Sequence, residues 1–301
     1  MRAVIFHGPG DLRLEEVPDP EPGPGDVLVR IEVALTDGTD LKAFRRGHPV
    51  LLGEPPSPFG HEFCGIDVAT GRRVVAANSD SKRDDLRLLN GAYAELLVVP
   101  ERIARVNLHP VPDGLAPEVA ALVEPLACCL HGVDRAGIRG GETVAVLGAG
   151  PIGLMLCACL VDAGAHPLVV GGRPERRALV PEFGGSLGAG EGADVVIEAA
   201  GTATAWSQAL GLVRKDGTVV LFGGLPAGEQ VPLDAYRLHY DELTVRGAFH
   251  HTPQTVRAAL AFLVSGAFPW RRLITHEVGL EQLAELFADP PRDLLKAAVR
   301  P

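Results

Sequence analysis

The stretch Val144-Ala145-Val146-Leu147-Gly148-Ala149-Gly150-Pro151-Ile152-Gly153 decides the fold of this chain. An apolar strand leads into a Gly-x-Gly-x-x-Gly turn, and an apolar segment suited to a helix follows. The first glycine permits the tight turn, the second lets the backbone approach a pyrophosphate, and the third lets helix and strand pack closely. The N-terminus of that helix favours an anion. The pattern predicts a dinucleotide-binding fold with cofactor contacts at Gly148, Gly150, Pro151, Ile152 and Gly153.

The chain on both sides of this turn alternates between strand and helix from about residue 117 onward. Such alternation predicts an α/β fold with a doubly wound parallel sheet and crossover helices. The expected strands are 143–147, 168–170, 194–198, 218–222 and 243–246, and the expected helices are 151–163, 175–183, 203–213 and 253–265.

The first hundred residues predict β structure with no long helix. Apolar residues at 27, 29, 31 and 33 occupy alternate positions, and Pro/Gly clusters punctuate the strands. After about residue 268 we expect a strand at 273–277, a helix at 280–287 and a strand at 296–299. The predicted domains are therefore a β-rich one of residues 1–125 and 268–301, and a dinucleotide-binding one of residues 126–267.

The end of the second strand of the parallel sheet indicates which dinucleotide binds. Proteins specific for NAD place an Asp or Glu there for the ribose 2′-hydroxyl, whereas this chain has Gly171-Gly172-Arg173. Gly172 is interpreted as leaving room for a 2′-phosphate. Arg173, with Arg176 and Arg177 one turn along, can meet a phosphate with charge-assisted hydrogen bonds. The sequence thus favours NADP over NAD, with Gly172, Arg173 and Arg177 as contacts, unless these arginines form an ordinary solvated helix face.

Composition narrows the class of protein further. The net charge of the 301-residue chain is −10 with both signs interspersed, so no basic stripe is available to bind nucleic acid. The N-terminus runs directly into a strand-like segment, and no apolar run of about 18 residues occurs. We therefore expect a cytoplasmic protein without a signal peptide or membrane segment. The 5 cysteines include no Cys-x-x-Cys pair.

Three further motifs contain residue types that bind metals. They are Asp37-Gly38-Thr39-Asp40, Gly60-His61-Glu62 and Glu124-Pro125-Leu126-Ala127. Zinc accepts carboxylate oxygens and imidazole nitrogens, and a catalytic zinc site leaves one position open. In this order, the motifs resemble those of the zinc-dependent medium-chain dehydrogenases, a family that includes alcohol, threonine, sorbitol and glucose dehydrogenases. The resemblance covers essentially the whole chain.

The resemblance implies a GroES-like β-rich catalytic domain, a Rossmann domain, one catalytic zinc, and hydride transfer between NADP(H) and an alcohol, polyol or sugar. The implied metal ligands are Asp37, where most relatives have Cys, together with His61 and Glu124. Glu62 is a fourth ligand or an exchangeable catalytic neighbour. An oxygen ligand at position 37 binds zinc less tightly than a thiolate and makes other divalent ions more competitive.

The resemblance also implies a route for the substrate proton. Thr39 corresponds to the residue that takes this proton, and in the family the relay continues through the nicotinamide ribose to a residue three positions on, which is Lys42 here. Thr39 has an alternative role as the cap of a short helix at 40–44. In relatives the strand corresponding to 243–249 pairs subunits, which implies a homo-oligomer, either a dimer or a tetramer.

Two departures from the family pattern are visible. The segment 76–90 contains no Cys, so the lobe that holds a structural zinc is absent. Between Glu182 and Asp194, a Gly-rich stretch replaces the usual strand and crossover helix, which predicts a trimmed sheet edge beside the adenine pocket. Two other functions stay open at this point: a zinc-free quinone or enone reductase of the same superfamily, and a catalytically silent NADP-binding protein.

Overall fold

Antiparallel pairing organises the first hundred residues, as their alternating pattern predicts. The computed structural model describes residues 1–48, 51–80 and 88–301, and these divide into unit 1 (1–125 and 252–301) and unit 2 (126–251). The strands of unit 1 are β1 (Arg2–Gly8), β2 (Asp11–Glu16), β3 (Val27–Leu35), β4 (Ser57–Pro58), β5 (Glu62–Asp67), β6 (Arg73–Ala76), β7 (Leu96–Val99), β8 (Leu108–Pro110), β15 (Ile274–Gly279) and β16 (Lys296–Arg300).

Two sheets form from these strands. The small one has the order β2-β1-β4, and the larger one has the order β15-β16-β3-β5-β6-β8, with β7 also pairing with β3. Because β16 pairs with β3, the last strand of the chain lies next to the strand that ends at Leu35. Residues distant in sequence therefore meet at the end of β3, just before Asp37.

Short helices connect and cover the strands of unit 1. They are α1 (Gly38–Arg46), α2 (Glu101–Asn107), α3 (Pro117–Ala120), α9 (Pro253–Ser265), η2 (Trp270–Leu273), η3 (Leu280–Gln282) and α10 (Leu283–Ala288). The core beneath them is apolar and aromatic, and Phe59 packs against the rings of Phe6 and Phe287 at centroid distances of 5.9 and 5.8 Å.

The second boundary between the units differs from the sequence-based expectation. The sequence places residues 252–267 in the dinucleotide-binding domain, whereas α9 groups with unit 1. The reason lies in its packing, since α9 contacts α2 and α3, which are both elements of unit 1. A boundary at residue 267 cannot be read from the helical pattern, because periodicity does not reveal which neighbour a helix packs against.

Unit 2 is the doubly wound domain that the glycine turn predicts. Its sheet is parallel throughout, in the order β11-β10-β9-β12-β13-β14. The elements are α4 (Val123–Ala136, which begins in unit 1), β9 (Thr143–Leu147), α5 (Pro151–Asp162), β10 (His166–Val170), α6 (Pro174–Arg177), η1 (Val180–Phe183), β11 (Ser186–Leu187), β12 (Ala193–Glu198), α7 (Ala203–Leu212), β13 (Val213–Leu221), α8 (Ala235–Tyr240) and β14 (Thr244–Gly247).

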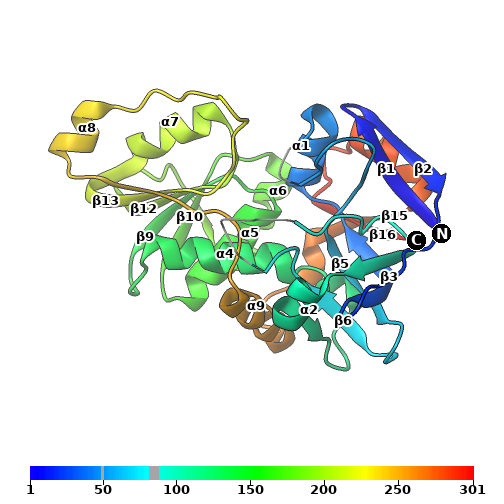
Figure 1. Ribbon diagram of the computed structural model, residues 1–301. Helices are drawn as coiled ribbons and strands as arrows, with labels where there is room; N and C mark the ends of the chain where they lie inside the picture. The colour runs from blue at the N-terminus through cyan, green and yellow to red at the C-terminus, as the bar shows by residue number, and fades with distance from the viewer. Residues whose placement is uncertain (49–50, 81–87) are drawn as a thin grey trace. The chain divides into compact units, whose positions relative to one another are not determined.

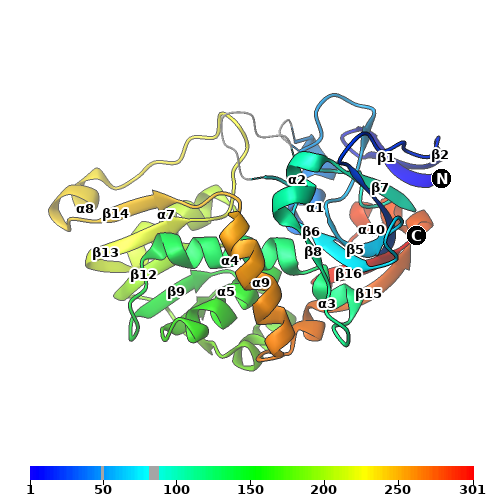
Figure 2. The same cartoon turned by 60° about the horizontal axis from the view of Figure 1, so that its bottom comes forward.

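Helices cover both faces of this sheet. Figures 1 and 2 show α4 and α5 on one face and α7 on the other. On the face covered by α7, Ala145 and Leu147 of β9 share a buried cluster with Ala205 and Ala209. The alternate residues of β9, Val144 and Val146, are also buried. A continuous apolar strand is typical of a parallel sheet that is buried on both sides.

One local prediction in unit 2 is wrong in detail. The expected helix 175–183 is broken into α6 and η1, because Pro181 lacks an N–H and its ring disfavours the α conformation at the preceding residue. The predicted trimmed edge of the sheet is confirmed, because in the Gly-rich stretch after Glu182 only Ser186 and Leu187 form a strand, which pairs with β10.

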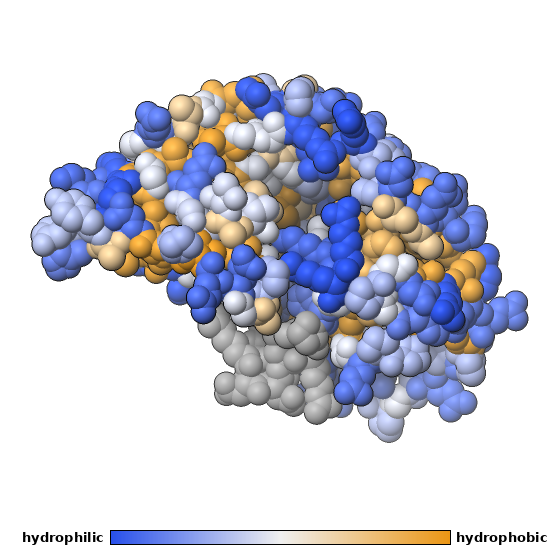
Figure 3. Space-filling model, turned by 90° about the horizontal axis from the view of Figure 1, so that it is seen from above, coloured by the Kyte–Doolittle hydropathy of each residue, from blue (hydrophilic) through white to orange (hydrophobic). Residues whose placement is uncertain are grey.

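The surface carries mixed chemistry. On the face seen in Figure 3, hydrophilic side chains are interspersed with smaller hydrophobic patches. Several exposed large hydrophobic residues lie at or near α8 and β14, namely Leu233, Tyr236, Tyr240 and Phe249. Within residues 1–48, 51–80 and 88–301, no helix has the length and apolar character needed to cross a membrane.

Candidate functional site

Asp37 lies two residues after the end of β3 and is the N-cap of α1. Its backbone is extended, with φ −142° and ψ 177°, and its Oδ1 accepts a hydrogen bond of 2.6 Å from the backbone N–H of Asp40. The alternative that Thr39 caps a helix at 40–44 is therefore wrong, because Asp37 has the geometry and side-chain oxygen that a cap needs. Thr39 lies in the first helical turn, three residues before Lys42, so the two side chains share one face of α1.

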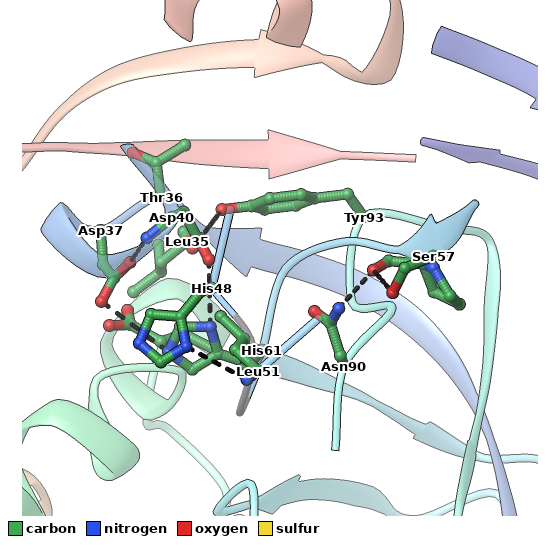
Figure 4. A network of polar contacts seen from close by, with 12 residues as sticks. Leu35, Thr36, Asp37, Asp40, His48, Leu51, Ser57, His61, Asn90 and Tyr93 are labelled. Carbon is green, nitrogen blue, oxygen red and sulfur yellow. Dashed lines mark hydrogen bonds and ion pairs between the residues drawn. The ribbon is translucent and has the colours of Figure 1, made fainter. Parts of the chain in front are cut away.

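His61 is buried between two carboxylates. Its Nδ1 lies 3.1 Å from Oδ1 of Asp40, and its Nε2 lies 3.7 Å from Oδ2 of Asp37, as Figure 4 shows. Burial lowers the pKa of His61, but the charges of Asp40 and Asp37 outweigh it and hold the pKa well above its usual value. The two ring nitrogens thus face different partners, one at each side of the ring.

The carboxylate of Asp37 keeps its charge in this buried setting. Burial by itself raises the pKa of Asp37, yet the positive charges of His61 and Lys296 hold the pKa below its usual value. A charged carboxylate beside an imidazole nitrogen is a donor pair that zinc accepts. Asp40 behind the imidazole matches the carboxylate partner that orients a metal-binding histidine in many sites.

Three of the four predicted ligands gather in unit 1, since ligand atoms of Asp37, His61 and Glu62 all lie within 4.8 Å of one another. Glu124, the second residue of α4, is not part of that group, so its role as a ligand stays a prediction. It is also buried, and its negative charge raises the pKa of His61. On the chemistry of this donor set, the residues present fit a divalent zinc ion.

Glu62 has a partner that sequence reasoning missed. Lys296, the first residue of β16, places its Nζ 2.7 and 2.6 Å from the two carboxylate oxygens of Glu62, and it also donates to the carbonyl of Thr36 at 3.2 Å. Both side chains are buried, and although burial lowers the pKa of Lys296, the charge of Glu62 raises it. Glu62 can reach a metal only if this ion pair opens, so its role as a ligand stays a prediction.

Two residues near the metal-type motifs, Lys296 and His48, are not among the predicted site residues, and the sequence contains a signal for Lys296. Lys296 is the one charged residue in the apolar run 294–299, which is a signal that a buried charge has a partner. His48 lies two residues after the end of α1, and burial together with the charge of His61 lowers its pKa. Neither residue stands in a motif, so the sequence does not connect them with the metal ligands.

The glycine turn in unit 2 has the predicted geometry. Gly148 adopts φ +115°, and a Cβ on Gly153 would lie 2.0 Å from the carbonyl oxygen of Gly148. Gly150 is the N-cap of α5, and Pro151 and Ile152 form its first positions. The first N–H groups of a helix have no partner within that helix, so the turn offers donors to a pyrophosphate. These residues fit a dinucleotide.

Gly172 has a different reason for being glycine from the one the sequence indicates. Its φ is +89°, and a Cβ there would lie 2.5 Å from the Cβ of Ala149. Any side chain at position 172 would therefore strain the backbone and collide with the glycine turn, whether or not a phosphate is bound. This packing requires glycine at position 172 by itself, and the interpretation that Gly172 leaves room for a 2′-phosphate stays a prediction.

The three arginines next to Gly172 are not equivalent. Arg173 and Arg177 are exposed, whereas Arg176 is half-buried. A guanidinium nitrogen of Arg176 lies 3.9 Å from the position that a Cβ on Gly150 would occupy. Burial, followed by the charge of Arg173, lowers the pKa of Arg176. A phosphate at the turn would relieve the repulsion between these cations. Arg176 is therefore a stronger candidate for contacting the phosphate than Arg177, and the contact predicted for Arg177 stays a prediction.

A parallel-sheet unit with this glycine turn, in one chain with a β-rich unit holding a carboxylate–histidine cluster, defines a dinucleotide-dependent dehydrogenase. Residues 23–113 match the family model of the alcohol dehydrogenase GroES-like domain, and residues 151–265 match that of zinc-binding dehydrogenases. The erythritol/L-threitol dehydrogenase of Mycolicibacterium smegmatis is 32% identical to this chain, covering 94% of it and 92% of the relative.

Two further matches are also dehydrogenases. The L-galactonate-5-dehydrogenase of Escherichia coli is 29% identical, covering 99% of this chain and 98% of the relative. A structure from Sinorhizobium meliloti 1021, described as a candidate zinc-binding dehydrogenase bound to NADP, is 31% identical with a TM-score of 0.88, covering 100% of this chain and 99% of that one. This chain belongs to the zinc-dependent medium-chain alcohol dehydrogenase family, so the predicted family, fold class and oxidoreductase activity are confirmed.

Proposed function

We propose that this enzyme interconverts a polyol, or a related sugar alcohol, and its carbonyl compound with zinc and NADP(H). The observation that carries the proposal is the arrangement around His61, whose Nε2 faces Asp37 while its Nδ1 is held by Asp40. Asp37, His61 and Glu124 would hold the zinc. When bound, zinc supplies a Lewis acid that lowers the pKa of an alcohol and polarises a carbonyl.

The residues of α1 supply the path for the proton. NADP⁺, when bound, would supply the acceptor for the hydride of the carbinol carbon. The hydroxyl proton would leave by way of Oγ1 of Thr39 toward Lys42, so that the overall products would be a carbonyl compound, NADPH and a proton. Thr39 and Lys42 are one helical turn apart and both are half-buried. This spacing supports a proton relay along one face of the helix.

The proposed preference for NADP rests on charge. Residues 171–174, which follow β10, include no carboxylate, and an Asp or Glu there would repel a 2′-phosphate. The guanidinium of Arg176 lies beside Gly150 of the glycine turn, and the charge of Arg173 acts on Arg176. The relative from Sinorhizobium meliloti binds NADP. The choice of a polyol substrate is supported by relatives that are erythritol/L-threitol and L-galactonate dehydrogenases.

We also propose a homodimer in which β14 pairs with β14 of a second copy. Strand β14 is the last strand of the six-stranded sheet and bonds to β13 on one side. An edge strand offers a row of backbone donors and acceptors to another chain. Light scattering should give twice the mass of 31.7 kDa, and a Pro substituted for Val245 should reduce it to one chain.

The test of the catalytic proposal is a substrate screen with zinc-loaded and chelator-treated enzyme. Tetritols, pentitols, hexitols and simple alcohols are offered with NADP and with NAD. The proposal expects turnover of polyols that disappears on chelation and returns with zinc. Turnover that is unaffected by chelation would support a zinc-free reductase, and NADP binding without any turnover would support a silent binding protein.

A further inference from the structure

Tyr93 is a buried tyrosine whose hydroxyl reaches the metal-ligand cluster. Its ring is 1% exposed and packs against the rings of Phe59 and Phe287, at centroid distances of 5.8 and 6.2 Å. The hydroxyl donates to Oδ2 of Asp40 and lies 3.1 Å from the carbonyl oxygen of Leu35. Figure 4 shows the hydroxyl pointing into the group formed by Asp37, Asp40 and His61.

The segment that carries Tyr93 is fixed to the segment that carries His61. The backbone N–H groups of Gly91 and Ala92 donate to the carbonyl of Gly60 at 2.7 and 2.9 Å, and that of Tyr93 donates to Phe59 at 3.0 Å. Gly60 has φ +87°, and a Cβ there would lie 2.7 Å from the ring of Tyr93. The ring therefore has little freedom to move relative to the residue before His61.

Asp40 connects the tyrosine with two of the proposed ligands, His61 and Asp37. One oxygen of its carboxylate faces Nδ1 of His61 at 3.1 Å, and the other accepts from Tyr93. Its backbone N–H donates to Oδ1 of Asp37 at 2.6 Å. Because Asp40 is fully buried, an unpaired carboxylate oxygen would be costly, and the tyrosine hydroxyl keeps the carboxylate from rotating away from the imidazole.

We propose that Tyr93 is a positioning residue of the metal centre, which acts through Asp40 to fix the orientation and tautomer of His61. The inference rests on the proposed zinc function of this cluster and adds a residue to it. Partners that orient a metal-binding histidine typically contribute about 10- to 100-fold in metal affinity. Tyr93 acts one step further out, so removing its hydroxyl should weaken zinc binding about 3- to 10-fold.

The experiment compares Tyr93→Phe with the wild type. The phenylalanine keeps the ring that packs beside Gly60 and removes only the hydroxyl. Zinc affinity is measured by competition with a chromogenic chelator, and the visible spectrum of the cobalt-substituted protein reports the geometry of the centre. Tyr236→Phe is the matched control, because Tyr236 is 69% exposed on α8. We expect weaker zinc binding and an altered cobalt spectrum for Tyr93→Phe alone, with an unchanged Kd for NADP.

A double-mutant cycle separates positioning from general stability. If Tyr93 acts through Asp40, then Tyr93→Phe should cause no further loss of zinc affinity in an Asp40→Ala background, where no side-chain oxygen remains to accept from the hydroxyl. Additive losses, or a Tyr93→Phe protein with the zinc affinity and cobalt spectrum of the wild type, would overturn the inference while leaving the proposed function intact. A wild-type protein that neither binds zinc nor needs it for turnover would overturn both.

Discussion

The glycine turn of unit 2 lies within residues 148–153, whereas the His61 cluster of unit 1 draws on positions 37, 40, 61, 93 and 296. In the turn, the required property is a backbone shape, since Gly148 has a positive φ and a Cβ on Gly153 would collide with the carbonyl of Gly148. In the His61 cluster, the required property is a set of buried charged groups that neutralise one another and form hydrogen bonds with one another. A short motif is enough to describe the first, but the second depends on which strands become neighbours.

The largest effect is expected for a variant that disrupts the His61 cluster and leaves the glycine turn unchanged. His61→Ala removes the central imidazole, and kcat/KM should fall on the order of a thousandfold or more, because a Lewis acid at the substrate oxygen contributes several kcal/mol. The Kd for NADP, measured by fluorescence titration, should change less than about twofold, because His61 belongs to unit 1 and the glycine turn to unit 2.

His239→Ala, on the exposed surface of α8, is the control for that variant and should behave as the wild type. Substantial activity remaining in His61→Ala would contradict the assignment of His61 and would favour a reductase without zinc.

The second prediction concerns the long-range contact on which the cluster depends. Lys296→Met leaves the buried charge of Glu62 without its partner, 234 positions away in sequence. Breaking a buried ion pair in this way typically costs about 3–5 kcal/mol in the free energy of unfolding. Urea denaturation measures the loss.

The combined variant Lys296→Met with Glu62→Gln removes both charges and should recover a large part of that stability, because no charge is then left buried without a counterion. If Lys296→Met unfolds at the same urea concentration as the wild type, the ion pair does not support the cluster.

The third prediction concerns a variant that distorts the glycine turn of unit 2. Gly153→Ala places a Cβ 2.0 Å from the carbonyl oxygen of Gly148, so the helix must move away from the strand. Overpacking of this kind costs about 1–3 kcal/mol, and NADP affinity should fall with it because the phosphate-binding N–H groups shift. Differential scanning calorimetry and NADP titration follow the two effects.

Gly211→Ala provides the matched control for Gly153→Ala. Gly211 lies in α7 with open space around its Cβ position, so an alanine there should stabilise the protein by up to about 1 kcal/mol. Equal behaviour of the two variants would mean that the close approach in the turn is unimportant.

The fourth prediction sharpens the assignment of the cofactor to unit 2. An arginine–phosphate contact contributes about 1.5–3 kcal/mol, so NADP should be preferred over NAD by roughly ten- to a hundredfold in kcat/KM. Arg176→Ala and Arg173→Ala should each reduce this preference, whereas zinc affinity should not change. Gly172→Asp is not a suitable test, because a side chain at that position collides with Ala149.

The smallest expected effect separates the two roles of Asp37. Asp37→Asn keeps a side-chain oxygen for the N-cap of α1 but removes the charge that a metal prefers, whereas Asp37→Cys offers a thiolate and loses the cap. The cysteine variant should bind zinc more tightly than the wild type and lose about 1 kcal/mol of stability in the metal-free state. Zinc titration and thermal unfolding measure both, and a cysteine variant with unchanged zinc affinity would argue that residue 37 is not a ligand.

The sequence by itself determined the features that depend on residue type and local spacing. The strand, glycine turn and helix at 144–153 predict the parallel sheet, and the three metal-type motifs predict the family, which the comparisons confirm. A break at Pro181 also follows from local chemistry, because a proline lacks the N–H that a continuous helix needs. Such features are readable because backbone conformation, capping and steric limits act over only a few residues.

The remaining features required the folded chain. That Lys296 neutralises Glu62, and that Tyr93 holds Asp40 against His61, follows from β16 lying beside β3 and from the segment at 91–93 lying against Gly60. The same holds for Gly172, whose need for glycine comes from its contact with Ala149. Spacing along the chain carries no information on these contacts, because a buried charge or polar group selects its partner by distance after packing, and packing brings together residues that any number of positions can separate.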